Sequence, residues 1–161
     1  MARVQLITTG VMEERALGKC LQRCFPGHEF VAKPKLDGFT SAKLPPDLAS
    51  MSPTQRLLLN IHKFASALIG TFAPGGREDR QRPDFVLAVE DLELLNADAP
   101  ERVTRTVRDS VAHNLENWPL AGPTRARLRA ALQERCSFHL MAPMTEAYFF
   151  ADPAALATAT A

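Results

Sequence analysis

The chain has 161 residues, of which 46% are hydrophobic and 23% are charged. This balance predicts one globular domain with its own core and excludes a chain that is disordered throughout. The formal net charge is only +1, so the excess of basic residues typical of histone-like nucleic-acid binders is absent. A nuclease that binds its substrate through metal ions and a local basic patch remains compatible with this charge.

Residues 1–156 are expected to form a single domain. The Ala- and Thr-rich residues 157–161 are expected to be a disordered tail of a chain that has been cut short. No apolar run approaches the roughly 18 residues that span a bilayer, and no signal peptide follows Met1, so we expect a cytoplasmic protein with no membrane contact. The three cysteines (Cys20, Cys24 and Cys136) are an odd number, which argues against a disulfide framework and favours reduced thiols in the core.

The first half of the chain predicts two strands around a helix. Residues 3–10 are rich in branched apolar side chains and end at a glycine, as a strand does. Apolar side chains then recur at helical spacing over residues 11–25, and Pro-Gly at 26–27 ends that helix. Residues 28–33 predict a second strand. Residues 34–51 lack a clear period and predict a long loop, a type of segment that is often functional.

The second half predicts three helices and two strands. Ser-Pro at 52–53 is a good helix start, and an apolar stripe follows to residue 72. Residues 84–89 are a nearly continuous apolar run, which suits a central parallel strand covered on both faces. Residues 99–118 and 124–136 predict helices, and residues 137–141 predict the last strand.

Strands and helices therefore alternate along most of the chain, and residues 145–150 begin one more predicted helix. This alternation predicts an α/β fold with a mainly parallel sheet and helices on both faces. In such folds ligands bind outside the carboxyl ends of the strands, where the strand order reverses. The residues that follow each predicted strand are therefore the first candidates for a functional site.

Acidic residues recur at these strand ends: Glu13 and Glu14 after the first strand, Glu90, Asp91 and Glu93 after the third, and Glu146 and Asp152 after the fourth. Carboxylates that converge repel one another, and a divalent cation such as Mg²⁺ relieves that cost. Two such ions can clamp the attacking and leaving oxygens of a phosphodiester. The alternative is that the acids after the first and fourth strands merely favour helix starts, where negative charge is stabilised in any protein.

Other motifs carry less information. The four histidines (His28, His62, His113 and His139) show no metal-ligand spacing, and His62 and His139 are expected to be structural or solvated. No GxGxxG, P-loop or GxSxG motif is present. The arginines at 125, 127, 129 and 135 make a basic helix, which is either a solvated face or a source of phosphate contacts.

Three segments together resemble the Toprim-like (topoisomerase–primase) domains: the opening Gly10-x-x-Glu13, the acidic Glu90-Asp91-x-Glu93, and the late stretch from Pro143 to Asp152. Within these domains, the chain more closely resembles small bacterial members related to the overcoming-lysogenization-defect nucleases and to some defence-system proteins. It covers about residues 3–156. The resemblance implies a four-stranded, mostly parallel sheet between helices and a site for Mg²⁺, or alternatively Mn²⁺.

Carried over residue by residue, Glu13 matches the Glu of the Gly-x-x-Glu opening. Asp91 and Glu93 match the metal-binding acidic pair, and Glu146 matches the late Glu before the aromatic run. Two positions depart from the family pattern. The usual acid/base Glu directly before the glycine is Thr9 here, and the second Asp of the Asp-x-Asp pair is Glu93.

The leading expectation is an Mg²⁺-dependent nuclease or phosphodiester-processing domain that acts on nucleic acid in phage defence. Glu13, Asp91 and Glu93 would be catalytic, and the metal ligands would be Glu13, Glu90, Asp91, Glu93 and Glu146. The alternative is a catalytically inactive module that binds a protein partner in a multi-protein bacterial system. A small-molecule phosphotransfer enzyme is a third reading, against which the lack of a phosphate-cradling glycine loop counts.

Overall fold

The computed structural model describes residues 1–33, 36, 39–41, 44, 52, 60–74, 82–93 and 96–142. The strands are β1 (Arg3–Thr8), β2 (Glu29–Ala32), β3 (Phe85–Asp91) and β4 (Cys136–Met141). The helices are α1 (Val11–Cys24), α3 (Asn60–Phe72), α4 (Pro100–Glu116) and α5 (Gly122–Arg135). Each overlaps an element expected from the sequence. Residues 53–59 of the helix expected from residue 52, the helix expected at 145–150 and the tail at 157–161 lie outside the described residues.

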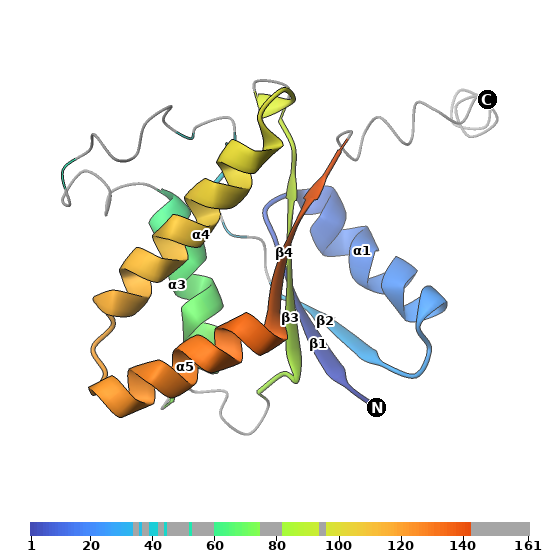
Figure 1. The fold of residues 1–161 in the computed structure, drawn as a ribbon. Helices are drawn as coiled ribbons and strands as arrows, with labels where there is room; N and C mark the ends of the chain where they lie inside the picture. The colour runs from blue at the N-terminus through green and yellow to red at the C-terminus, as the bar shows by residue number, and fades with distance from the viewer. Residues whose placement is uncertain are drawn as a thin grey trace, which may run out of the picture.

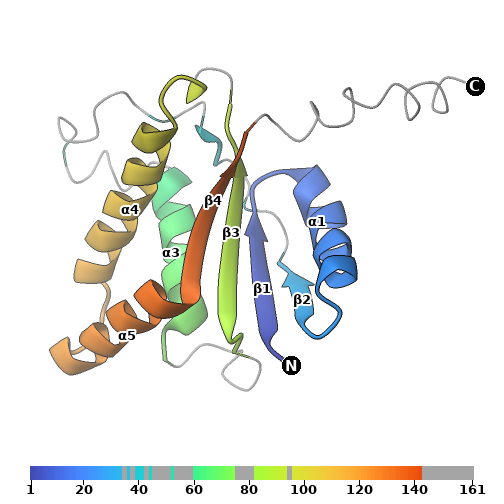
Figure 2. The ribbon, with the colours of Figure 1, turned by 45° about the vertical axis from the view of Figure 1, so that its right-hand side comes forward.

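The four strands form one sheet in the order β2-β1-β3-β4, and every neighbouring pair is parallel. Helix α1 lies on one face of the sheet, and α3, α4 and α5 lie on the other (Figures 1 and 2). The expectation of an α/β fold with helices on both faces of a mainly parallel sheet is therefore confirmed. From β1 the chain passes to β2 on one side and then to β3 on the other, so the strand order reverses between β1 and β3.

The main core lies between the sheet and α3. The apolar stripe expected on this helix is buried, and Phe64 at its centre has no exposed surface. The Phe64 ring stacks on Phe39, with centroids 4.9 Å apart, and meets Phe138 of β4 edge-on at 5.8 Å. Aromatic contacts thus join the segment after β2, the helix and the edge strand in one core.

Helix α1 covers the opposite face more thinly, packing on β1 and β2. Gly18 is on the side of α1 that faces β1, because a Cβ there would lie 3.4 Å from a methyl group of Leu6. Cys20 and Cys24 are exposed, so the expectation that they are core thiols is wrong, and Cys136 is half-buried. The side of α1 that faces the sheet is the one with Gly18, and the two cysteines are turned away from it.

Helices α3 and α4 share a buried polar contact. His62 is 5% exposed, and its Nδ1 lies 2.6 Å from Oδ1 of Asn114. Nδ2 of Asn114 donates in turn to the backbone oxygen of His62 at 2.8 Å and to Oγ of Ser66 at 2.9 Å. His62 therefore holds two helices together, which is the structural role expected for it. In the part of the chain that the structure describes, no helix combines the length and apolarity needed to cross a bilayer.

Candidate functional site

The candidate site lies where β1 and β3 end side by side, at the reversal of strand order. The sequence predicts that the central strand ends at residue 89, but β3 runs two residues further, because Glu90 and Asp91 pair with Leu140 and Met141 of β4. These two acids therefore belong to the strand instead of following it. Since successive side chains of a strand point to opposite faces, Glu90 and Asp91 point away from each other.

Glu90 lies on the face that α3 covers, with Val86 and Ala88, and it is 2% exposed. Its Oε1 accepts a hydrogen bond of 2.7 Å from the backbone N–H of Ser41, and its Oε2 accepts one from the hydroxyl of Thr9. The carboxylate is thus held between the end of β1 and the segment that follows β2. Two donors from separate parts of the chain set its orientation.

The environment of Glu90 favours its neutral form. The pKa of this carboxyl is raised to about 7, chiefly because burial removes the water that would solvate the charge. The negative charge of Glu93 raises the pKa further, and the hydrogen bonds from Thr9 and Ser41 lower it. At neutral pH this side chain is therefore close to the midpoint of its titration.

Ser41 has no exposed surface and fastens the segment after β2 to the end of β3. Its hydroxyl donates to the backbone oxygen of Asp91 at 3.1 Å and accepts from the backbone N–H of Glu93 at 3.3 Å. Its own backbone oxygen accepts a hydrogen bond of 2.7 Å from Nδ2 of Asn96, whose Oδ1 accepts one from the guanidinium of Arg102. The network links the sheet edge to the first turn of α4.

Glu93 is the second acidic residue beside Glu90 at the carboxyl end of β3. Its Oε1 accepts a hydrogen bond of 2.9 Å from the hydroxyl of Thr40, the residue before Ser41. Its charge acts on the pKa of Glu90, so the two carboxylates are near enough to repel. Glu93 is partly exposed whereas Glu90 is buried, so a solvent-borne cation would reach Glu93 first.

Glu13 lies on the other side, in the first turn of α1, and is 4% exposed. Its carboxylate folds back over Gly10, because a Cβ built on Gly10 would lie 1.8 Å from Oε2 of Glu13. The spacing Gly-x-x-Glu therefore has a local physical reason: the glycine leaves room for an acid one helical turn later. Negative charge at the start of a helix is also favoured by its dipole.

The predicted acidic residues at the carboxyl ends of β1 and β3 thus lie in two separate sets. Glu90 and Glu93 lie with Thr9 and Ser41, whereas Asp91 points to the face of the sheet on which α1 carries Glu13. Among the described residues, no three His, Cys, Asp or Glu side chains are close enough together to hold a metal ion. The fifth predicted ligand, Glu146, lies outside the described residues.

Several residues of this site were not singled out by the sequence: Thr40, Ser41, Asn96 and Arg102. The sequence signal for the first two is weak. They are a pair of hydroxyl residues within the predicted loop at 34–51, a type of segment that is often functional. Asn96 and Arg102 carry no local signal, because their role depends on contact with a segment more than 50 residues earlier in the chain.

The basic helix α5 is mostly engaged elsewhere. Arg125 and Arg129 pair with Glu116 of α4, and Arg135 donates to two backbone oxygens just before β3. Arg127 and Arg129 are both exposed, and Arg129 is the one of these two that pairs with Glu116. These contacts favour a structural role for most of the basic helix over contact with phosphate at the sheet edge.

No protein-family model, curated protein or solved structure matches this chain. The side chains gathered at the carboxyl ends of β1 and β3 are therefore the basis for assigning a function.

Proposed function

We propose that the domain binds Mg²⁺ or Mn²⁺ at the carboxyl ends of β1 and β3 and acts on nucleic-acid phosphodiesters, as its Toprim-like sequence features imply. The observation that carries this proposal is Glu90, a carboxylate that is buried beside a second one, Glu93, at the ligand-binding position of an α/β sheet. Burying a negative charge near another is costly, and a divalent cation offsets that cost.

The donor set at this edge suits a hard cation, because it consists of carboxylate oxygens. The proposed ligands of the ion are Glu93, which lies beside Glu90, and Asp91, which points to the side that carries Glu13. Glu13 and Glu146 would serve as further ligands or as the general base. When bound, the ion would activate water and stabilise the charge that develops on the phosphate. Glu90 can hold or release a proton near neutral pH, since its pKa is about 7, and so suits acid–base work beside the ion.

A cleavage assay tests the proposal. The purified full chain is incubated with supercoiled plasmid and with single-stranded DNA in Mg²⁺, in Mn²⁺, or in EDTA. We expect metal-dependent cleavage that falls at least about tenfold in Asp91→Asn and in Glu93→Gln, the lower end of the loss that outer-shell partners alone produce at metal sites. Glu134→Gln, which removes an exposed acid on α5, is the matched control and should retain full activity. Unchanged cleavage in both edge variants would refute the assigned roles.

A second function is favoured by one specific observation at Thr9. This residue stands where the resembled family has its acid/base Glu, and its hydroxyl donates to Glu90. A domain that lacks this acid could serve as an inactive module that binds a protein partner. Calorimetry with Mn²⁺ distinguishes the two functions: heat that disappears in Glu93→Gln supports the metal site, whereas no heat and no cleavage support the interaction module.

A further inference from the structure

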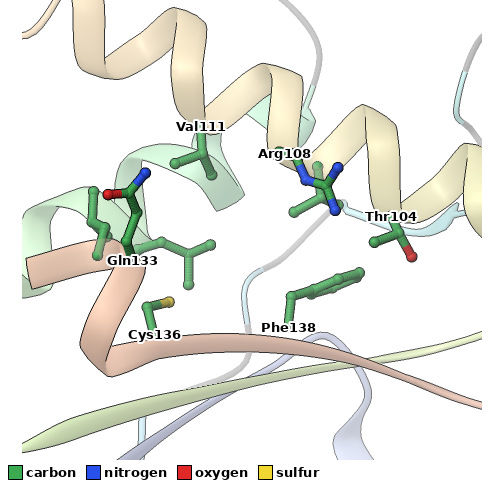
Figure 3. A pocket seen from close by; sticks show the side chains of 9 residues that line it. Thr104, Arg108, Val111, Gln133, Cys136 and Phe138 are labelled. Atoms are coloured by element: carbon green, nitrogen blue, oxygen red, sulfur yellow. The ribbon is translucent and has the colours of Figure 1, made fainter. Parts of the chain in front are cut away.

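A cavity of about 440 Å³ lies between α4, α5 and β4, with α3 behind it (Figure 3). It is on the face of the sheet that α3 covers. None of the described residues that line it is one of the acidic residues at the carboxyl ends of β1 and β3. Its volume is within the range of roughly 300–1,000 Å³ that small-molecule sites occupy. The cavity is therefore large enough for a ligand of its own.

The interior of the cavity is apolar. Its walls include Leu68, Val107 and Leu132, which are almost completely buried, and the ring of Phe138 from β4. Figure 3 shows Phe138 and Cys136 on β4 below the cavity, facing α4 above it. Contact with this surface favours a hydrocarbon ligand over a sugar or a nucleotide, because those would leave polar groups without partners.

Cys136 does not make the interior polar. Burial raises the pKa of its thiol to about 11, so the sulfur remains an uncharged thiol at neutral pH. A thiol in this state behaves as a small apolar group with low nucleophilicity. We therefore read Cys136 as part of the apolar wall and assign it no chemical step.

The rim of the cavity carries a positive charge. Among the described residues that line it, Arg108 of α4 is the charged one, and Gln133 of α5 lies toward the other end of the cavity (Figure 3). Both side chains are exposed, and no ion pair of Arg108 with any described residue is found. Thr104, one helical turn before Arg108, adds a hydroxyl to the same rim. A guanidinium beside an apolar cavity without acidic walls attracts an anionic head group.

We propose that this cavity binds a small amphipathic carboxylate, such as a medium-chain fatty acid. The hydrocarbon chain would lie against Phe138, Val107 and Leu132, and the carboxylate would pair with Arg108. The charge and the apolar walls together select this ligand, because a cation of the same length would meet the positive arginine and a shorter anion would leave the apolar wall in water.

Isothermal titration calorimetry on the full chain tests the proposal with octanoate as the ligand. We expect saturable binding that weakens by about tenfold or more in Arg108→Gln, the effect of losing a charged hydrogen bond. Arg105→Gln is the matched control, since Arg105 is an exposed arginine of the same helix that does not line the cavity. Octyltrimethylammonium, a cation of similar length, should bind the unmodified chain no more tightly than octanoate binds the Arg108→Gln variant.

Alkylation of the cysteines locates the bound octanoate. Octanoate should slow the reaction of Cys136 with a maleimide, while the exposed Cys20 and Cys24 act as internal controls whose rates stay unchanged. Val111→Trp, which places a large side chain at the cavity wall, should remove both the heat and the protection. Absence of saturable binding, equal affinity in Arg108→Gln, or binding that leaves Cys136 unprotected would each overturn the proposal. A circular dichroism spectrum like that of the unmodified chain confirms that each variant is folded.

Discussion

Replacing Glu90 with glutamine removes a buried negative charge and preserves the shape of the side chain. The amide oxygen of the variant can accept the hydrogen bond from the backbone N–H of Ser41, and its NH₂ group can donate to the hydroxyl oxygen of Thr9. The packing at the sheet edge is therefore retained. What changes is the response of stability to pH.

The sign of this response follows from the direction of the pKa shift. The folded protein holds a proton on Glu90 up to about pH 7, whereas the ordinary value for a glutamate is 4.5. Between these values the folded state binds more protons than the unfolded state, so its stability falls as the pH rises. The shift corresponds to a loss of roughly 2–3 kcal/mol in the free energy of unfolding between about pH 5 and about pH 8. Glu90→Gln cannot ionise and avoids this loss.

Urea unfolding followed by circular dichroism measures the effect, in EDTA at both pH values. As the pH rises, the unfolding free energy of Glu90→Gln should increase relative to that of the unmodified chain by roughly 2–3 kcal/mol. Glu134→Gln, at an exposed acid, should show no such change. A difference that is the same at both pH values would contradict the reasoning. Adding Mg²⁺ at about pH 8 should reduce the difference in unfolding free energy between the variant and the unmodified chain, because a bound cation favours the charged carboxylate.

Two further substitutions probe the core and the acidic edge. Phe64→Ala removes a completely buried ring that contacts two other rings, and it should lower the unfolding free energy by about 3–5 kcal/mol in a urea titration. The control is Phe25→Ala. Because Phe25 is 52% exposed, this variant should lower the unfolding free energy by less than about 1 kcal/mol. Gly10→Ala forces the carboxylate of Glu13 to move, and it should therefore weaken the binding of Mn²⁺ measured by calorimetry. The same substitution should lower the unfolding free energy by about 1 kcal/mol. Gly27→Ala, where a Cβ meets nothing within 4 Å, should leave Mn²⁺ affinity unchanged, and equal affinities in the two glycine variants would argue against a role for Glu13.

Local signals in the sequence determined the elements of this fold. The nearly continuous apolar run before Glu90 predicted a central strand, and β3 lies between β1 and β4. Pro-Gly at 26–27 predicted the end of the first helix, and α1 ends at Cys24. These features depend on neighbours within one or two turns, so they can be read without knowing the tertiary structure. The alternation of strands and helices then led to the parallel sheet, since parallel strands need crossover connections.

The contents of the site depended on the tertiary structure. Pairing with β4 extended β3 through Glu90 and Asp91 and so turned these adjacent acids to opposite faces. Ser41 reached the end of β3 from a loop about 50 residues earlier in the chain, a contact that no local pattern encodes. The side of α1 that packs on β1 and β2 likewise decided that Cys20 is exposed. Periodicity along a chain specifies which elements form and which side of each is apolar. The partner that each polar group meets, and with it the pKa of Glu90, is set only when distant segments pack together.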